Sequence, residues 1–463
     1  MNKQTTSKLL RYGAIVAVIV TITVLLKDTT VMPFRAVSTT ATTTTNNSGY
    51  INLTVDTTTV NSSIVTEVGQ QLSVTAPIST SNSKSVPVTT NNRKVVTNLN
   101  SLHIGDFTQA QIHESSPAFW PRAYSPTEVS AFASTTVPTG RRPAEIYYAY
   151  GIDKIVSKGE GQTVAIVVPA GSDTLVNDLN TYSAYFGLPN ATVSFIYPQG
   201  VPTVRNDGWA LETTLDATMV HMIAPKAKIL MVICNTSAIA GLTQGIDAAV
   251  AAGAKIISLS WGSVEWSGQA NYSYHLNVPG VVITSATGDS GYGVSWPSTE
   301  SGVVAVGGTQ LVSSGTTGTV VEQVWARSGG GISKYYSRPL WQAKAQSTAF
   351  RTVPDLSINA SGYTIYMSNY AGQKGFLNST GTSASSPIIA GLVALGYSTR
   401  TSALPTDIHP TLYTNSSSFI KDIIGGTTGT GANAVLGTAT TGYDYATGLG
   451  VPNAPMFVNN LTK

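Results

Sequence analysis

The sequence predicts an α/β fold in which a parallel β-sheet carries helices on both faces. From about residue 141, short runs rich in Val and Ile alternate with stretches of helical periodicity. Continuous apolar strands separated by helices are typical of a parallel sheet that is buried on both sides. The chain has 463 residues, of which 42% are hydrophobic, so it is long enough for one large domain of this kind and a smaller region.

The N-terminal region, residues 1–35, is predicted to be a signal peptide or a signal anchor. Residues 1–11 carry Lys3, Lys8 and Arg11 and no acid, and residues 12–26 are almost wholly apolar. A positively charged flank stays on the cytoplasmic side of the membrane, so the rest of the chain is expected to face the cell exterior. The apolar run has the length of a signal peptide and is short of the roughly 20 residues of a spanning helix, so both alternatives remain.

Residues 36–140 form the next predicted region. Thr, Ser, Asn and Val dominate residues 38–101, with a Thr run at 42–45. Such a composition indicates a stalk or a β-rich segment.

The composition limits the possible functions. Charged residues make up only 11% of the chain and the net charge is +3. A surface of hydroxyls and amides keeps its contacts where carboxylates are protonated, which fits an acidic exterior and equally an ordinary secreted surface. Lys and Arg are scattered, so nucleic acid is not an expected partner. Cys234 is the only cysteine, which excludes a disulfide framework.

The predicted elements follow the alternation along the chain. The strands are Thr163–Val168, Val193–Tyr197, Lys228–Cys234, Lys255–Ser260, Val281–Ala286 and Val303–Val306, and the helices are 173–186, 207–223, 239–252 and 384–397. In a parallel sheet the chemistry lies beyond the carboxyl ends of the strands. Candidate residues are therefore sought directly after the strands.

Ser383 is the candidate nucleophile. It stands in Gly-Thr-Ser-Ala-Ser-Ser-Pro, before an apolar helix. Free backbone N–H groups and the helix dipole favour negative charge at such a position. Pro387 is expected in the first turn of that helix, where its missing N–H costs nothing. Taken alone, Ser383 is also compatible with a plain N-cap.

Glu212 and Asp216 are candidate acid–base residues. Four residues apart on a predicted helix, their carboxyl groups lie on nearly one face. Like charges at this spacing repel, unless one is protonated or both serve a site. An exposed pair of acids is the alternative.

Asp289 is the third candidate. It follows a predicted buried strand in Thr-Gly-Asp-Ser-Gly. Its position after a core strand favours a role in chemistry, although Asp and Gly also form ordinary turns.

A histidine base is the usual partner of a serine nucleophile. The sequence has five histidines, and none stands in a His-Gly-Thr-His-like context. His221 lies five residues after Asp216, about 140° around the helix. We expect it at the surface or behind the acidic residues.

These three motifs, in this order, resemble the sedolisin family of serine-carboxyl peptidases, which share the fold of subtilisin. Glu212 and Asp216 resemble the family's Glu-X-X-X-Asp helix, Gly288-Asp289 its Gly-Asp turn, and Thr380–Pro387 its Ser-Gly-Thr-Ser-X-X-X-Pro, with Thr380 in place of Ser. Further segments similar to the family are 258–262, 306–309, 329–333 and 353–357. The resemblance covers residues 141–463 and implies a subtilisin-like peptidase domain there.

The resemblance also implies a role for each residue. Glu212 takes the proton of Ser383, Asp216 orients Glu212 and shares its proton, and protonated Asp289 donates a hydrogen bond to the oxyanion. A histidine is protonated at about pH 4, whereas a glutamate is still partly ionised there. The resemblance therefore implies a secreted or surface-anchored endopeptidase that works in acid on protein or peptide substrates, as a monomer.

A structural calcium ion is the expected cofactor. The resemblance assigns as its ligands the side chains of Asp422 and Asp444 and the carbonyls of Ile423, Thr440 and Gly442. Carboxylates and carbonyls on a Gly-rich loop suit Ca²⁺, and a plain surface loop is the alternative.

Three alternatives stay open at this stage. Residues 36–140 are also compatible with a short, divergent prosegment, which the family's precursors carry. An inactive, peptidase-like surface protein that binds glycans or peptides is the alternative function. A subtilisin-type hydrolase with a displaced histidine would instead gain activity toward neutral pH.

Overall fold

The computed structural model describes residues 138–463, except Ser314, Asn415 and Lys463, and the backbone of six strands before residue 98. The chain divides into two units, Met1–Ser115 and Ser116–Lys463. In the first unit, β1 (Ile19–Leu26), β2 (Arg35–Thr45), β3 (Tyr50–Asp56) and β4 (Ser73–Pro77) form an antiparallel sheet, and β5 (Val86–Thr90) pairs with β6 (Arg93–Thr97).

The predicted N-terminal regions fall mostly outside the described residues. Of residues 1–35 only β1 and the start of β2 are described, and of residues 36–140 only strands and the last three residues. No helix in the described part of the chain is both long and apolar enough to cross a membrane. The signal or anchor and the stalk or prosegment therefore stay predictions.

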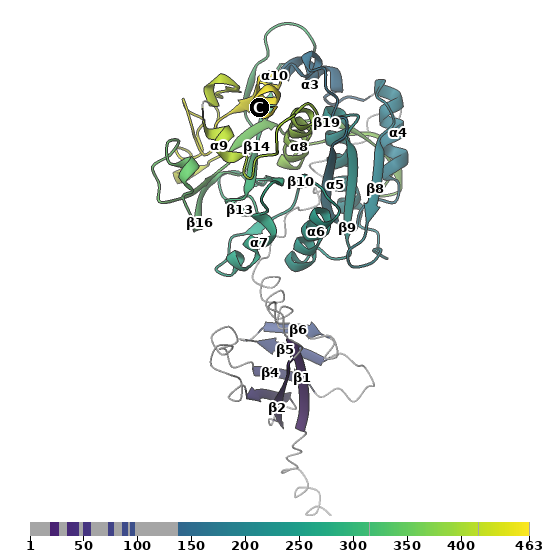
Figure 1. The fold of residues 1–463 in the computed structure, drawn as a ribbon, viewed down its shortest axis with the longest axis vertical. Helices are drawn as coiled ribbons and strands as arrows, with labels where there is room; N and C mark the ends of the chain where they lie inside the picture. The colour runs from purple at the N-terminus through teal and green to yellow at the C-terminus, as the bar shows by residue number, and fades with distance from the viewer. Residues whose placement is uncertain are drawn as a thin grey trace, which may run out of the picture. The chain divides into compact units, whose positions relative to one another are not determined.

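The second unit is built on an eight-stranded sheet (Figure 1). Seven strands run in the order β15-β14-β12-β10-β7-β9-β8, and β18 pairs with β14. All neighbours are parallel except β14 and β15. The strands are β7 (Thr163–Pro169), β8 (Thr192–Ile196), β9 (Lys228–Cys234), β10 (Ile256–Leu259), β12 (Val282–Ala286), β14 (Val303–Leu311), β15 (Glu322–Val324) and β18 (Leu356–Asn359).

Helices cover both faces of this sheet, which confirms the predicted α/β architecture. Side chains of α5 and α8 share one core with alternate strand residues such as Ile166 and Met231. On the other face, α6 approaches closely at Gly245, where a methyl group would lie 2.7 Å from Cγ1 of Val167. The helices are α3 (Pro143–Tyr150), α4 (Leu175–Phe186), α5 (Asp207–Ile223), α6 (Ile239–Ala251), α7 (Ser273–Leu276), α8 (Thr382–Ser398), α9 (His409–Tyr413) and α10 (Ala454–Leu461).

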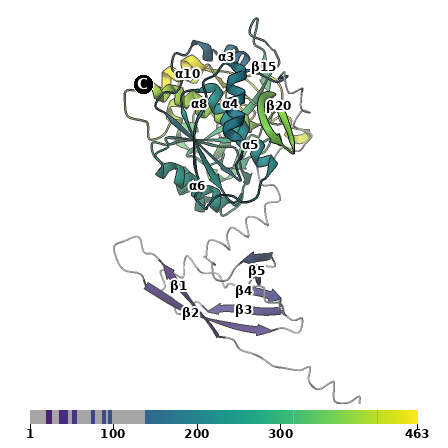
Figure 2. The ribbon, with the colours of Figure 1, turned by 90° about the vertical axis from the view of Figure 1, so that its right-hand side faces the viewer.

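Helix α8 lies at the centre of this unit (Figures 1 and 2). It packs on α5, on the sheet and on α10, and its residues 382–397 are all buried. The contact with α10 is close, since a methyl group at Gly396 would lie 2.7 Å from Cβ of Leu461. A side hairpin, β19 (Tyr363–Tyr370) and β20 (Gln373–Ser379), packs on α4 and α5. The remaining strands are β11 (Ser263–Val264), β13 (Ser295–Trp296), β16 (Gly331–Ser337), β17 (Phe350–Val353), β21 (Ile420–Lys421) and β22 (Val451–Pro452).

Candidate active site

Helix α5 carries the two predicted acid–base residues into the interior. The helix begins at Asp207 because the side chain of Asn206 accepts a hydrogen bond from Trp209 N, 3.0 Å away. Every residue from Trp209 onward is buried, and Glu212 and Asp216 are both 0% exposed. The alternative of an exposed acidic pair is therefore wrong.

Burial sets the protonation of this pair. It raises the pKa of Glu212 well above its usual range, and the carboxyl of Asp216 raises it further. Burial likewise raises the pKa of Asp216, against a hydrogen bond from Ser260. Two such groups close together in an apolar setting do not readily ionise at the same time.

Ser383 lies in the first turn of α8, 1% exposed. The helix starts at Thr382 and Gly381 occupies the N-cap position, so the N-cap alternative for Ser383 is wrong. The hydroxyl of Ser383 acts on the Glu212 carboxyl and lowers its pKa, although neither oxygen of Glu212 makes a well-directed hydrogen bond to a described residue. Ser383 and Glu212 are thus neighbours in the site.

Pro387 lies beyond the first turn of α8, not within it as predicted. In an α-helix the N–H of residue 387 would bond to the carbonyl of Ser383, and proline has no N–H. The hydroxyl of Ser260 donates to that carbonyl oxygen instead, at 3.2 Å. The proline therefore leaves the carbonyl of Ser383 open to a bond from outside the helix.

Ser260 is the residue that sequence reasoning missed. It directly follows β10, and its Oγ lies 2.7 Å from Oδ1 of Asp216 as well as near the Ser383 carbonyl. One hydroxyl therefore joins α5 to α8. Its place just after a central strand was the available signal, because the carboxyl ends of parallel strands gather functional groups.

Asp289 joins the same site from the next strand. It follows β12 after two residues and is 4% exposed. Its Oδ1 accepts hydrogen bonds from Thr382 N and Thr382 Oγ1, both at 2.8 Å. Gly288 N donates to the same threonine hydroxyl at 3.0 Å. Asp289 is therefore fixed against the residue that precedes the nucleophile, and its charge also raises the pKa of Glu212.

The described histidines are bonded elsewhere. His221 is buried, not at the surface, and its Nε2 lies 3.0 Å from Ser183 Oγ and 2.8 Å from Pro189 O. His275 pairs with Asp247, and His409 pairs with Asp407. His103 and His113 lie outside the described residues. In the part of the chain that is described, carboxyl groups occupy the place of a histidine base.

The predicted calcium residues come together in the C-terminal loops. Oδ2 of Asp422 accepts from Gly442 N, and Oδ2 of Asp444 accepts from Thr440 N, both at 2.8 Å. Oδ1 of Asp422 is buried and has no hydrogen-bond partner among the described residues. An unpaired buried carboxylate oxygen is costly, and a cation would satisfy it. Within the described residues no group of three or more His, Cys, Asp or Glu is placed to hold a metal ion.

Comparisons with known proteins define the family. Residues 206–449 match the model of the subtilase family. Kumamolisin of Bacillus sp. (strain MN-32) is 30% identical over 383 residues, covering 73% of this chain and 66% of kumamolisin. Sedolisin of Pseudomonas sp. (strain 101) is 27% identical over 356 residues, covering 67% of this chain and 59% of sedolisin. The chain thus matches less than two thirds of the length of these relatives.

A solved structure agrees with the sequence comparisons. Pseudomonas sedolisin, a serine-carboxyl proteinase complexed with two molecules of pseudo-iodotyrostatin, superposes with a TM-score of 0.60 and 26% identity. The match covers 70% of this chain and 98% of that one. The chain belongs to the subtilase family. Within it, the chain is a member of the sedolisin group with a subtilisin-like fold.

Proposed function

We propose that this chain is a serine-carboxyl endopeptidase that hydrolyses peptide bonds in acid. The observation that carries the proposal is the meeting of one serine with three carboxyl groups, all buried, at the carboxyl ends of neighbouring parallel strands. The serine-carboxyl proteinase whose structure resembles this chain supports the same chemistry.

The reaction begins with transfer of the Ser383 hydroxyl proton to Glu212. Oγ bonds to the carbonyl carbon, and the electron pair of the C=O π bond moves onto oxygen. Asp289 donates a hydrogen bond to this oxyanion. Because its Oδ1 already accepts two hydrogen bonds, the proton that it donates belongs on Oδ2.

Collapse of the tetrahedral intermediate breaks the C–N bond. Glu212 returns its proton to the leaving amine, which departs and leaves an acyl group on Ser383. Water then loses a proton to Glu212 and attacks the acyl carbon, and the C–Oγ bond breaks as Oγ regains a proton. Asp216 stabilises Glu212 through both steps because the two carboxyls share one proton.

Acid activity follows from the same groups. Asp289 must be protonated to donate, which favours a pH near or below the usual carboxyl pKa of about 4. The Glu212–Asp216 pair must carry one negative charge to accept the serine proton. Hydrogen bonding from Ser383 and Ser260 offsets part of the burial that raises the pKa values of Glu212 and Asp216. The proposal requires that one negative charge remains on this pair in acid, where a histidine base would be protonated.

The test is cleavage of casein and of a mixed peptide library by the full chain at pH 3–4 and at pH 7. We expect cleavage in acid that falls at least about 10³-fold in Ser383→Ala and in Glu212→Gln. Ser385→Ala and Glu322→Gln serve as matched controls, since Ser385 lies on the same helix and bonds to Ile358 O, and Glu322 is a partly buried glutamate bonded to Tyr150.

Other results would contradict the proposal. Activity at pH 7 that survives Glu212→Gln would indicate a histidine base. A folded protein that cleaves nothing at any pH would favour an inactive, peptide-binding surface protein.

Calcium binding at Asp422 and Asp444 is part of this proposal. The unpaired Oδ1 of Asp422 supports it, and the carbonyls of Ile423, Thr440 and Gly442 would complete the oxygen set. The ion would hold the C-terminal loops in place without a part in bond cleavage.

Export to the cell exterior, by a cleaved signal or an anchor within residues 1–35, also belongs to the proposal. The positive flank and apolar run of the sequence support it. Fractionation and N-terminal sequencing of the expressed chain would check it, and full-length protein in the cytosol would contradict it.

A further inference from the structure

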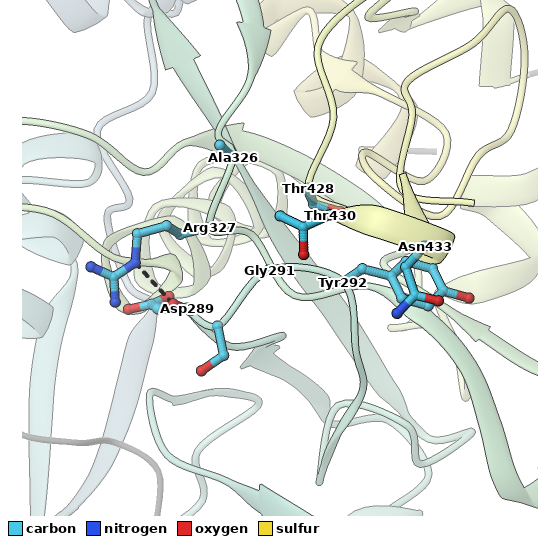
Figure 3. Close-up of a pocket in the computed structure, with 9 residues that line it drawn as sticks. Asp289, Gly291, Tyr292, Ala326, Arg327, Thr428, Thr430 and Asn433 are labelled. Atoms are coloured by element: carbon cyan, nitrogen blue, oxygen red, sulfur yellow. Dashed lines mark hydrogen bonds between the residues drawn. The ribbon is translucent and has the colours of Figure 1, made fainter. Parts of the chain in front are cut away.

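A cavity of about 400 Å³ has Asp289 in its lining. Three chain segments line it, namely 289–292 after β12, 326–327 after β15 and residues of the C-terminal loops. Figure 3 shows Arg327 and Asp289 on one side, and Tyr292, Thr428, Thr430 and Asn433 on the other. A cavity of this size can hold one long side chain.

The walls of the cavity are held by backbone hydrogen bonds. Gly291 N donates to Arg327 O at 2.8 Å, and Tyr292 N donates to Thr428 O at 2.9 Å. Gly291 has φ +78°, and a methyl group there would lie 2.7 Å from Thr428 O. The three segments are thus fastened to one another, and a ligand would meet a preformed surface.

The position of the cavity connects it to the reaction. Asp289 lines it and is also bonded through Thr382 to the nucleophile helix. A peptide whose scissile carbonyl oxygen lies at the Asp289 carboxyl would place a neighbouring side chain in this space. The cavity is therefore suited to select substrates.

The lining indicates the chemistry of that side chain. Among the described residues that line the cavity, Arg327 is the one base and Asp289 the one acid, and the other lining groups are hydroxyls, an amide, a phenol, a methyl group and backbone. Arg327 is anchored by its Nε, which donates to Asp289 O at 3.1 Å, and it lies over the ring of Trp325 with 5.9 Å to the centroid. Guanidinium groups bind carboxylates with charge-assisted hydrogen bonds.

We propose that this cavity is a specificity subsite for an acidic substrate side chain, with Arg327 as the residue that selects it. The proposal rests on the peptidase function proposed above and adds a substrate class to it. An ionised Asp289 would repel an acidic side chain of the substrate. The catalytic role proposed for Asp289 requires its protonated form, which carries no charge. Tyr292 is neutral in acid, because the ordinary pKa of a phenol is about 10, and burial and then Tyr445 raise the pKa of Tyr292 further.

The experiment compares peptides that differ only by Glu or Gln at one position, scanned over three residues on either side of the scissile bond. At pH 5 we expect kcat/KM about tenfold higher for Glu than for Gln at one position. The ratio should approach one at pH 3, where the substrate glutamate, with a pKa of about 4.3, is protonated.

Substitutions identify the residue responsible. In Arg327→Gln the Glu/Gln ratio should fall to about one, in Arg327→Glu below one, and in Arg327→Lys it should stay above one because the charge remains. Arg338→Gln, at a partly exposed arginine that does not line the cavity, should keep the wild-type ratio. A ratio that is the same in wild type and Arg327→Gln would overturn the proposal.

Binding separates this proposal from the proposed function. The full chain with Ser383→Ala is titrated with fluorescent Glu and Gln peptides, with and without Arg327→Gln. A Glu preference that disappears with Arg327→Gln supports the subsite even if the wild type cleaves nothing. Equal binding of both peptides overturns the subsite even if the wild type is an active peptidase.

Discussion

Pro387 shapes the site through the carbonyl of Ser383, which lies one helical turn earlier. Pro387 cannot donate to it, and the hydroxyl of Ser260 takes that place while also reaching Asp216. A hydroxyl has one proton to donate. When Asp216 is ionised, Ser260 donates to it at 2.7 Å, and when Asp216 is protonated at Oδ1, Ser260 can accept and turn its proton to Ser383.

Replacement of Ser260 by Ala tests whether its hydroxyl controls the pKa of Asp216. In Ser260→Ala the pKa of Asp216 should rise further, because the hydrogen bond that lowers it is lost. The acidic limb of kcat/KM should then move to higher pH, and kcat should fall about tenfold or more, as expected for one unpaired buried group. A pH–rate profile measures both effects.

Ser258→Ala is the matched control. Ser258 lies two residues earlier on β10 and bonds to Ser386, 3.0 Å away, and not to Asp216. Its profile should keep the wild-type midpoints. An equal loss of rate at every pH in Ser260→Ala, without a shift, would leave Ser260 with a structural role only.

At the scale of elements, the C-terminal loops pack against the segment that leads into β16. A methyl group at Gly330 would lie 1.8 Å from Tyr445 O, so the segment after Asp444 runs directly against residues 329–331. Thr428, which lines the cavity, accepts a hydrogen bond from Tyr292 N, in the segment that follows β12. Stability of these loops is therefore linked to the shape of the site.

Removal of calcium tests whether the proposed ion stabilises the C-terminal loops. Calcium at about 100 times its Kd should stabilise the fold by about 2.7 kcal/mol, and a chelator should lower the Tm by several degrees. Asp422→Asn should lower the Tm in calcium to the chelated value, measured by differential scanning calorimetry. Asp153→Asn, at an exposed carboxylate, is the control. A wild-type Tm that does not respond to calcium would contradict the proposed ion.

A buried charge cluster joins β17, the start of β18 and α9. Arg351 donates to both oxygens of Asp355, and His409 lies between Asp355 and Asp407. Burial alone would raise the pKa of Asp355, but Arg351 and then His409 hold it well below its usual range. Burial alone would lower the pKa of His409, but the two carboxylates raise it to about 9.

The cluster should stabilise the fold most at mildly acidic pH. A raised histidine pKa stabilises the fold fully below about 6.5, and this contribution, ~3 kcal/mol, is lost as pH rises to about 9. A lowered aspartate pKa stabilises above about 3.9 and is lost as pH falls further. In His409→Gln the loss in unfolding free energy, from urea titrations, should therefore be larger at pH 5 than at pH 9. Equal losses at both would contradict the charged state of His409.

At the scale of the whole molecule, the sheet and its covering helices could be predicted because buried parallel strands are runs of Val and Ile. Helix α5 matches its predicted range, since Asn206 caps it and Pro225 follows it. The hairpin of β19 and β20 was missed, because polar residues such as Thr364, Ser368 and Asn378 interrupt its apolar pattern. The role of Ser260 could not be predicted either, since it depends on three distant segments meeting.

Helix α10 closes over the far end of the helix that carries the nucleophile, with Leu461 against Gly396. A ribosome releases the chain from its N-terminus, so α8 emerges before α10 exists. Until then the apolar end of α8 lacks its cover, and the site that α8 organises lacks a fixed frame. A nascent chain in which α8 has emerged without α10 should thus lack an ordered site.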